Sequence, residues 1–272
     1  MCTLLRIVGS NPTLSVLYFV NNLIIFMRIA LGVEYDGTNY HGWQKQHNVD
    51  SIQGQIELAL SKVASHSISV IAAGRTDAGV HAIEQVMHFD TNVQRPHNAW
   101  VAGVNSYLPN DIKVLWVKYV DNSFHARYNA IARKYRYLIY NYPIASALFR
   151  NRAMWYKLSL NEKLMYNAGQ LLIGEHDFSS FRASGCQSKS AIRRMISIDI
   201  NRTNNIINID IKANAFLLHM VRNIIGVLIK IGNREHNIHW VHDILVSKNR
   251  NHSGITAKAH GLYLLKISYP NL

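Results

Sequence analysis

RIALGVEYDG, residues 28–37, has apolar side chains at every second position, and an Asp-Gly pair follows them. The apolar positions are Ile29, Leu31, Val33 and Tyr35, which would share one face of a strand. A period of two is typical of a half-buried strand, and an Asp-Gly pair is typical of a tight turn. We therefore expect the folded part of the chain to begin with a strand at residues 28–35.

The segments after this strand follow the order expected of an α+β fold. Asp50 and Gln53 match a capping box, and the apolar positions from Ile52 to Val63 recur at helical spacing. Strands are expected at residues 68–73, 82–90 and 111–120, and a second helix at residues 97–106. This β-α-β-β-α-β order is typical of a ferredoxin-like (RRM-like) unit rather than of a doubly wound sheet.

The second half of the chain repeats this scheme loosely. Helices are expected at residues 160–173, 215–231 and 238–247, and strands at residues 132–142, 191–201, 206–213 and 261–269. We predict two α+β halves, residues 27–130 and 131–272. The two halves would form one mostly antiparallel central sheet with helices packed on it, and an active-site cleft would lie between them.

The segment before Met27 is apolar but does not read as part of this fold. No charged residue occurs from Ile7 to Met27, as in a signal peptide or a membrane anchor. Asn11, Pro12, Asn21 and Asn22 interrupt the apolar run, however, and no small-residue cleavage site follows it. We interpret residues 1–26 as an upstream extension of the reading frame, with translation starting at Met27; a membrane anchor is the alternative.

Composition limits the partners of the chain. Its 29 Lys and Arg exceed its 16 Asp and Glu, which gives a formal net charge of +13. An excess of this size predicts a polyanionic partner, either nucleic acid or an anionic membrane surface. Hydrophobic residues make up 49% of the chain, enough to bury a substantial core, so a disordered tail is excluded.

Cysteine and histidine give little sign of a metal site. Cys2 and Cys186 are the only cysteines and form no CxxC motif, so disulfides and structural zinc are not expected. His236, His239 and His242 would share one helical face, but no HExxH pattern or added carboxylate completes a ligand set. We expect a solvated helix face there, with a metal site as the alternative.

A buried arginine is predicted in the second half. The apolar stretch from Ala213 to Ile229 carries one charged residue, Arg222, which would sit near the middle of a buried helix. A guanidinium group keeps its proton, so its burial requires a carboxylate or phosphate partner. Arg222 should therefore contact an acid from elsewhere in the chain.

The loop from Ala73 to His81 is the most specific feature of the sequence. Gly74 and Gly79 bracket Arg75 and Asp77, as expected where the backbone must approach a ligand closely. Such a turn between strands is usually only a turn. A carboxylate in this loop near a buried arginine would stay ionised, however, and that favours a nucleophile over a proton donor.

The loop GRTDAGVH, residues 74–81, resembles the signature loop of the tRNA pseudouridine synthase A family. Further segments resemble this family in the same order, over about residues 28–270. They are EYDG at 34–37, YHGWQ at 40–44, FHAR at 124–127, ARKYRY at 132–137, DFSSFR at 177–182, KANAF at 212–216, HMVRN at 219–223 and AKAHGLYL at 257–264.

The resemblance implies an isomerase that converts uridine into pseudouridine without a cofactor, a metal or a redox step. Asp77 would be the nucleophile, attacking either C6 of the base or C1′ of the ribose. Tyr135 would stack on the flipped uracil and assist proton removal, and Arg222 would pair with Asp77. Arg75 would enter the RNA stem where the base has left, and Leu262 would pack against the uracil.

The resemblance also implies the partners and the setting. The substrate would be tRNA, at uridines 38, 39 and 40 of the anticodon stem-loop, and the protein would be a cytoplasmic homodimer in which each tRNA touches both subunits. Arg127, Arg133 and Arg136 lie where they would neutralise RNA phosphates. The alternatives are a non-catalytic tRNA-binding or RNA-chaperone protein and a hydrolase with paired carboxylates; the latter needs a second acid, which the loop lacks.

Overall fold

The computed structural model describes residues 26–270. The interpretation of residues 1–26 therefore concerns residues that, apart from Phe26, lie outside the described range. Within that range the fold is α+β, as predicted, and is built on one large and mostly antiparallel sheet of ten strands. No helix of the described residues is long and apolar enough to cross a membrane.

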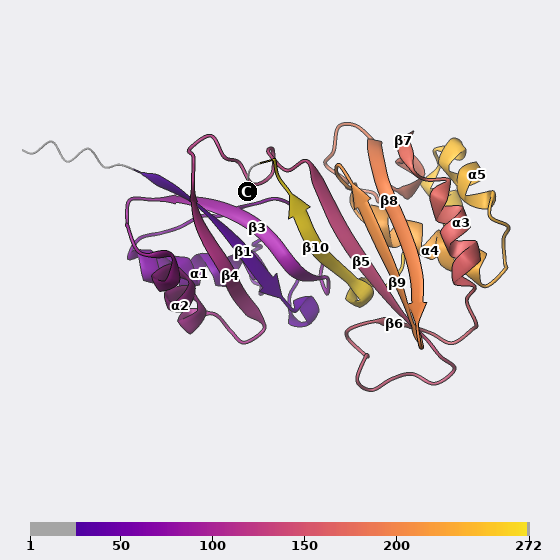
Figure 1. Ribbon diagram of the computed structural model, residues 1–272, viewed down its shortest axis with the longest axis horizontal. Helices are drawn as coiled ribbons and strands as arrows, with labels where there is room; N and C mark the ends of the chain where they lie inside the picture. The colour runs from indigo at the N-terminus through magenta and orange to yellow at the C-terminus, as the bar shows by residue number, and fades with distance from the viewer. Residues whose placement is uncertain (1–25, 271–272) are drawn as a thin grey trace, which may run out of the picture.

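The first half supplies one end of this sheet (Figure 1). The strand β1 lies between β3 and β4 and is antiparallel to both, and the short β2 pairs with β3. The helices α1 and α2 lie next to each other beside these strands. The elements are β1 (Met27–Tyr35), α1 (Ile52–Ala64), β2 (Ile71–Ala72), β3 (His81–Thr91), α2 (His97–Tyr107) and β4 (Ile112–Val120).

The second half supplies the other end, with β5 antiparallel to both β9 and β10. The helices α3, α4 and α5 gather at this end of the molecule (Figure 1). The elements are β5 (Ala132–Asn141), β6 (Met154–Tyr156), α3 (Glu162–Gln170), β7 (Gly174–Asp177), β8 (Ile192–Thr203), β9 (Ile206–Ala213), α4 (Met220–Gly232), α5 (Trp240–Ser247) and β10 (Leu262–Ser268).

The two halves join through one parallel strand pair. The main sheet runs β4-β1-β3-β10-β5-β9-β8-β7, so the last strand of the chain, β10, lies between β3 and β5. Only Tyr263 with His81 and Leu264 with Ala82 are in register between β10 and β3. The two groups of helices therefore lie apart, with β10 and β5 between them (Figure 1).

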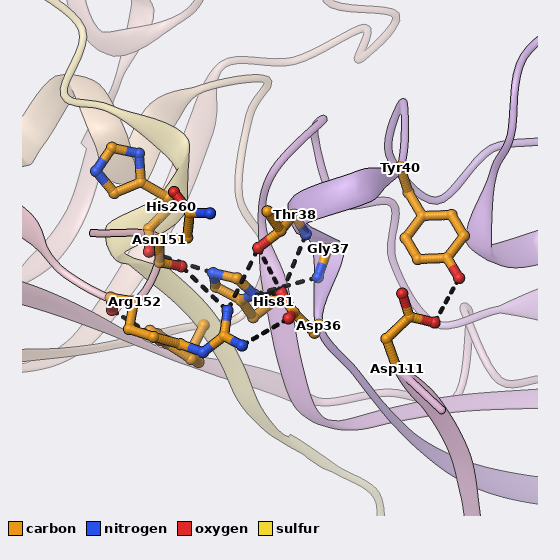
Figure 2. Close-up of polar contacts among 10 residues, drawn as sticks. Asp36, Gly37, Thr38, Tyr40, His81, Asp111, Asn151, Arg152 and His260 are labelled. Atoms are coloured by element: carbon orange, nitrogen blue, oxygen red, sulfur yellow. Dashed lines mark hydrogen bonds and ion pairs between the residues drawn. The ribbon is translucent and has the colours of Figure 1, made fainter. Parts of the chain in front are cut away.

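A polar network crosses this junction (Figure 2). The carboxylate of Asp36, in the turn after β1, pairs with Arg152, from the segment before β6, at 2.7 Å. The buried ring of His81 lies 2.9 Å from Asp36 and stacks on Tyr263 of β10. Side chains of both halves thus reinforce a strand pairing that is itself short.

Alternating apolar positions explain the core of the first half. Ile29, Leu31 and Val33 on β1 are fully buried, as expected, but Ala30 and Gly32 between them are buried too, so this central strand is covered on both faces rather than half-buried. Ile56 and Leu60 on α1 are also fully buried, at the spacing of one helical face.

Four local expectations are wrong. Ser51, not Asp50, caps α1, because its hydroxyl accepts the Gly54 N–H at 3.3 Å. The predicted helix at 215–231 begins only at Met220, because His219 has a left-handed backbone with φ of 58°. The strand expected at 68–73 shortens to two residues, and the strands β6 and β7 were not anticipated.

Candidate active site

The segment between β2 and β3, which contains Asp77, lines a cleft of about 660 Å³. Both halves contribute to the cleft, since Tyr135 comes from β5, Leu262 from β10 and Arg222 from α4. Of the eight side chains that the sequence singled out, seven line it: Arg75, Asp77, Arg127, Arg133, Tyr135, Arg222 and Leu262.

Hydrogen bonds from the first half fix the backbone of this loop. The Trp43 N–H donates to the Thr76 carbonyl at 3.0 Å, and the Gln85 side-chain amide donates to the Gly74 carbonyl at 2.8 Å. The hydroxyls of Thr76 and Tyr35 lie 2.8 Å apart. The loop is thus tied to β1, to β3 and to the segment before α1, which gives the Asp77 carboxylate a defined position.

Gly42 allows the loop to approach this closely. Its φ of +91° lies in the left-handed region, and a Cβ there would stand 2.8 Å from the Thr76 carbonyl oxygen and 3.1 Å from the Ala78 nitrogen. Only glycine meets both demands without strain. Gly42 and Trp43 therefore form the backbone surface on which the Asp77 loop packs.

The Asp77 carboxylate contacts two basic side chains of the second half. Arg222 donates from Nη1 to Oδ2 at 2.9 Å, and the His219 Nε2 lies 3.4 Å from the same oxygen. The Asp77 side chain is 24% exposed and that of Arg222 is 16% exposed. The ion pair is therefore only partly buried, and the Asp77 carboxylate stays open to the cleft.

A second contact orients the Arg222 guanidinium. Its Nε donates to the Ala257 carbonyl at 2.8 Å, and the Ala257 N–H donates back to the Arg222 carbonyl at 3.1 Å. A planar guanidinium held at two points presents Nη1 in a fixed direction. Arg222 thereby links Asp77 to the segment that leads into β10.

Tyr135 and Leu262 form an apolar wall of the same cleft. Tyr135 is 9% exposed, and its ring meets Phe216 edge to face with 5.1 Å between the ring centroids. Burial, together with the negative charge of Asp77, raises the pKa of Tyr135 to about 12. The side chain is therefore a neutral phenol near neutral pH. Leu262 is 5% exposed.

The three arginines predicted to bind phosphate differ in their surroundings. Arg127 is exposed at the cleft. Arg133 also lines the cleft, but its guanidinium donates to four backbone carbonyls, those of Ala73, Arg127, Ala130 and Asn214. Arg136 follows Tyr135 by one residue and so points to the opposite face of β5, where it binds Asp210 through two hydrogen bonds of 2.6 and 2.9 Å.

Arg75 is exposed beside the nucleophile loop. Its only hydrogen bond among the described residues joins Nη1 to the Gln187 side-chain oxygen at 3.1 Å. Gln187 belongs to a segment of the second half that also lines the cleft. Arg75 thus spans the mouth of the cleft through a contact that a ligand can replace.

The residue-by-residue reading missed His219 and Phe216. Both lie in the turn before α4 and line the cleft, in a segment that was expected to be helix. A signal for His219 was present, since it stands three residues before Arg222 at the start of the helix. A signal for Phe216 was absent, because one more aromatic residue in an apolar run predicts only burial.

The histidines considered as metal ligands lie elsewhere. The His236 ring stacks on Trp240 with a centroid separation of 3.7 Å. Between residues 26 and 270, no group of three or more His, Cys, Asp or Glu side chains is arranged to hold a metal ion.

Comparison with known proteins identifies the family of the chain. The tRNA pseudouridine synthase family matches residues 32–129 and 168–270, which include Asp77 and Arg222. A protein of Coxiella burnetii named tRNA pseudouridine synthase A is 52% identical over 243 residues, or 89% of this chain and 93% of that protein. Proteins of the same name from Shewanella piezotolerans and Pseudoalteromonas atlantica are each 52% identical over 244 residues, covering 90% of this chain and 94% and 93% of theirs. The chain belongs to the tRNA pseudouridine synthase family, a family of isomerases.

Proposed function

We propose that this isomerase forms pseudouridine at positions 38, 39 and 40 of the tRNA anticodon stem-loop, with Asp77 as its nucleophile. The observation that carries the proposal is the Asp77 carboxylate, held at 2.9 Å by Arg222 in a cleft that Tyr135 also lines. Positive charge at the cleft supports an RNA substrate, since Arg75 and Arg127 lie exposed beside it.

The reaction exchanges one bond of the nucleotide for another. Asp77 attacks C6 of the base or C1′ of the ribose, and the N1–C1′ bond breaks. The uracil rotates, C5 bonds to C1′, and the bond to Asp77 breaks, which restores the carboxylate. The proton on C5 leaves while N1 gains one. Because a carboxylate must be ionised to attack, the Arg222 guanidinium stabilises the form that reacts.

Tyr135 suits the task of holding the flipped base. Taking a base out of a stem costs about a few kcal/mol of stacking energy. An aromatic side chain in the site restores part of this energy by stacking on the flipped base. The pKa of about 12 keeps Tyr135 protonated before substrate binds, so we assign it stacking first. Assistance in proton removal would require its pKa to fall in the complex.

The arginines divide into RNA contacts and structural groups. Arg75 contacts Gln187 through a single exposed hydrogen bond within residues 26–270, and a ligand that replaces this bond would let the side chain enter the space that the base leaves. Arg127 is free to bind phosphate. Arg133 acts through the carbonyls it holds together, and Arg136 has no route to the cleft from the opposite sheet face.

The fold proposal follows from the strand order. In each half the first strand lies between the last strand and the next-to-last, as β1 lies between β4 and β3 and β5 between β10 and β9. This order is that of a ferredoxin-like unit. We infer two such halves, residues 27–130 and 131–272, in a protein that works in the cytoplasm, where tRNA is found.

We further infer a homodimer. Exposed apolar side chains concentrate in the segment that connects β5 with β6 and α3, where Ile144 is 71% and Leu148 is 87% exposed. This segment projects from the sheet as a loop (Figure 1). Pairing with a second copy would cover it. Sedimentation of the wild type and of Leu148→Asp tests this, and a monomeric wild type would contradict it.

Asp77→Asn is the decisive test of the mechanism. The change keeps the shape of the side chain and removes its nucleophilic charge. We expect no detectable pseudouridine in transcribed tRNA, with tRNA binding retained. Asp90→Asn is a matched control, since Asp90 pairs with Arg28 at 2.7 Å and does not line the cleft.

The same experiment separates the alternative function. An active Asp77→Asn variant would refute the nucleophile assignment. A wild type that binds tRNA but forms no pseudouridine would instead indicate a non-catalytic tRNA-binding or RNA-chaperone protein.

A further inference from the structure

An exposed tyrosine directly follows Arg127, a residue of the cleft, in the loop between β4 and β5. Tyr128 is 76% exposed, the largest exposure of any aromatic side chain in the described residues. Its neighbour Arg127 lines the cleft, and the Arg127 guanidinium carbon lies 5.9 Å from the Tyr128 ring centroid. Tyr128 thus presents an exposed aromatic ring beside a cationic side chain of the cleft.

The ring is supported from below by two histidines. The His125 ring stacks on Tyr128 with 4.2 Å between centroids and 28° between planes. His88, 2% exposed on β3, meets the His125 ring edge to face, with 4.9 Å between the ring centroids and 61° between the planes. The three rings form a column that rises from the core to the solvent, and Tyr128 is its outer end.

The backbone beneath the column is fixed at nearly every residue. The His125 Nδ1 accepts the N–H groups of both Arg127 and Tyr128 at 3.2 Å. The Ala126 N–H donates to His88 at 3.2 Å, and its carbonyl accepts the Tyr269 hydroxyl at 2.6 Å. Arg133 holds the Arg127 and Ala130 carbonyls.

This loop is therefore rigid while its most prominent side chain remains uncovered. A rigid aromatic face loses little conformational entropy when a flat partner stacks on it. Nucleobases are such partners, because each has a π face, and stacking on an aromatic residue contributes about 1–3 kcal/mol per base. The Arg127 guanidinium beside Tyr128 favours a polyanion as the molecule that carries the flat group.

We propose that Tyr128 is a stacking platform for one unpaired base of the RNA substrate, next to the nucleotide that enters the cleft. The proposal rests on the proposed function, since that supplies the RNA. It adds a second base-binding position, distinct from the Tyr135 pocket: Tyr135 is buried in the cleft, whereas Tyr128 is exposed and directly follows Arg127 of the cleft. The position recognises an unpaired and unstacked base of any identity, as in an RNA loop.

The test compares Tyr128→Ala with Tyr128→Phe and with Tyr107→Ala. Phenylalanine keeps the π face. Tyr107 is a matched control, because it is 54% exposed and has the Lys62 ammonium 5.0 Å from its ring centroid, but lies on α2 outside the cleft. Fluorescence anisotropy with a labelled anticodon stem-loop measures Kd. We expect Tyr128→Ala to raise Kd about 5- to 150-fold, from the 1–3 kcal/mol of one stacked base, while the other two variants bind like the wild type.

A stacking signature completes the test. When 2-aminopurine replaces single bases of the RNA loop, binding of the wild type should quench the fluorescence at one of these positions. Binding of Tyr128→Ala should not quench it. The rate of pseudouridine formation at saturating RNA should be unchanged in Tyr128→Ala, because the reacting groups are intact. Wild-type affinity in Tyr128→Ala, or equal loss in Tyr107→Ala, would overturn the proposal.

Two other failures remain distinguishable. If Tyr128→Ala changes the oligomeric state, the ring belongs to a protein interface and the platform proposal is wrong. If the wild type binds the stem-loop without forming pseudouridine, the proposed activity fails, while the anisotropy and quenching results still decide the role of Tyr128.

Discussion

The substitution Gly42→Ala places one methyl group between two segments that hold the Asp77 carboxylate. The new Cβ would lie 2.8 Å from the Thr76 carbonyl oxygen, well inside the carbon–oxygen contact distance, and 3.1 Å from the Ala78 nitrogen. Since Trp43 donates to the same Thr76 carbonyl, residues 42 and 43 cannot withdraw without breaking that hydrogen bond. The Asp77 loop must therefore shift by several tenths of an ångström.

The cost has two parts. Alanine at φ of +91° costs about 1–2 kcal/mol, and the steric overlap costs about 1–3 kcal/mol. Together they lower the free energy of unfolding by about 2–5 kcal/mol, which corresponds to a Tm about 5–15 °C lower. The displaced carboxylate should reduce kcat about 10- to 100-fold, because a misplacement of about 1 Å can cost about 100-fold.

Turnover is measured with tRNA that carries tritium at C5 of uridine, since the new C5–C1′ bond releases this hydrogen to water. Thermal unfolding of the same samples gives Tm. Gly103→Ala on α2 is the control, because its Cβ would meet Val63 at an ordinary 3.4 Å and should stabilise the helix by up to about 1 kcal/mol. Wild-type turnover and Tm in Gly42→Ala would refute the role given to this close approach.

Three further outcomes are expected. Arg222→Lys keeps the charge beside Asp77 but cannot also hold the Ala257 carbonyl, so kcat should fall at least about 10-fold with tRNA affinity unchanged; wild-type kcat would contradict this. Burial lowers the pKa of His88 to about 4, so the unfolded chain takes up more protons below about pH 6.5. The free energy of unfolding should therefore be highest above about pH 6.5 and fall by up to about 3 kcal/mol by pH 4, as urea unfolding at each pH would show. In His88→Gln the free energy of unfolding should depend less on pH. Arg127→Ala should lower the slope of log Kd for tRNA against log salt by about 1, whereas Arg136→Ala should not change it.

Local patterns predicted the long elements well and the short ones poorly. The strand at 28–35 and the body of α1 follow from their apolar spacing, and β1 extends only one residue further at its start. The strands β6 and β7 have three and four residues and no alternating apolar pattern, and they exist because β5 and β8 offer partners. Pairing of this kind depends on residues far away in the sequence.

In the candidate site, too, contacts between residues far apart in the sequence could not be predicted from local patterns. The need of Arg222 for an acid followed from the chemistry of guanidinium, but the identity of that acid came from the family resemblance, because 145 residues separate the two partners. The position of Arg136 could have been read from the sequence itself. It follows Tyr135 directly on a strand, so the two side chains must point to opposite faces, and only one of them can enter the cleft.

The division of the site between the halves makes the junction of the sheet important for catalysis. Asp77 precedes β3, whereas Tyr135 and Arg222 belong to the second half, so a relative movement of the halves changes every distance that the reaction needs. The strands β3 and β10 contribute only two register pairs to this junction, and the contacts of Asp36 with Arg152 and His81 lie beside them. The Asp77–Arg222 ion pair spans the same junction from within the cleft. Arg222, the partner of Asp77, is therefore also one of the contacts that keep the halves in register, and loss of Arg222 should misplace the carboxylate as well as leave it without its charge partner.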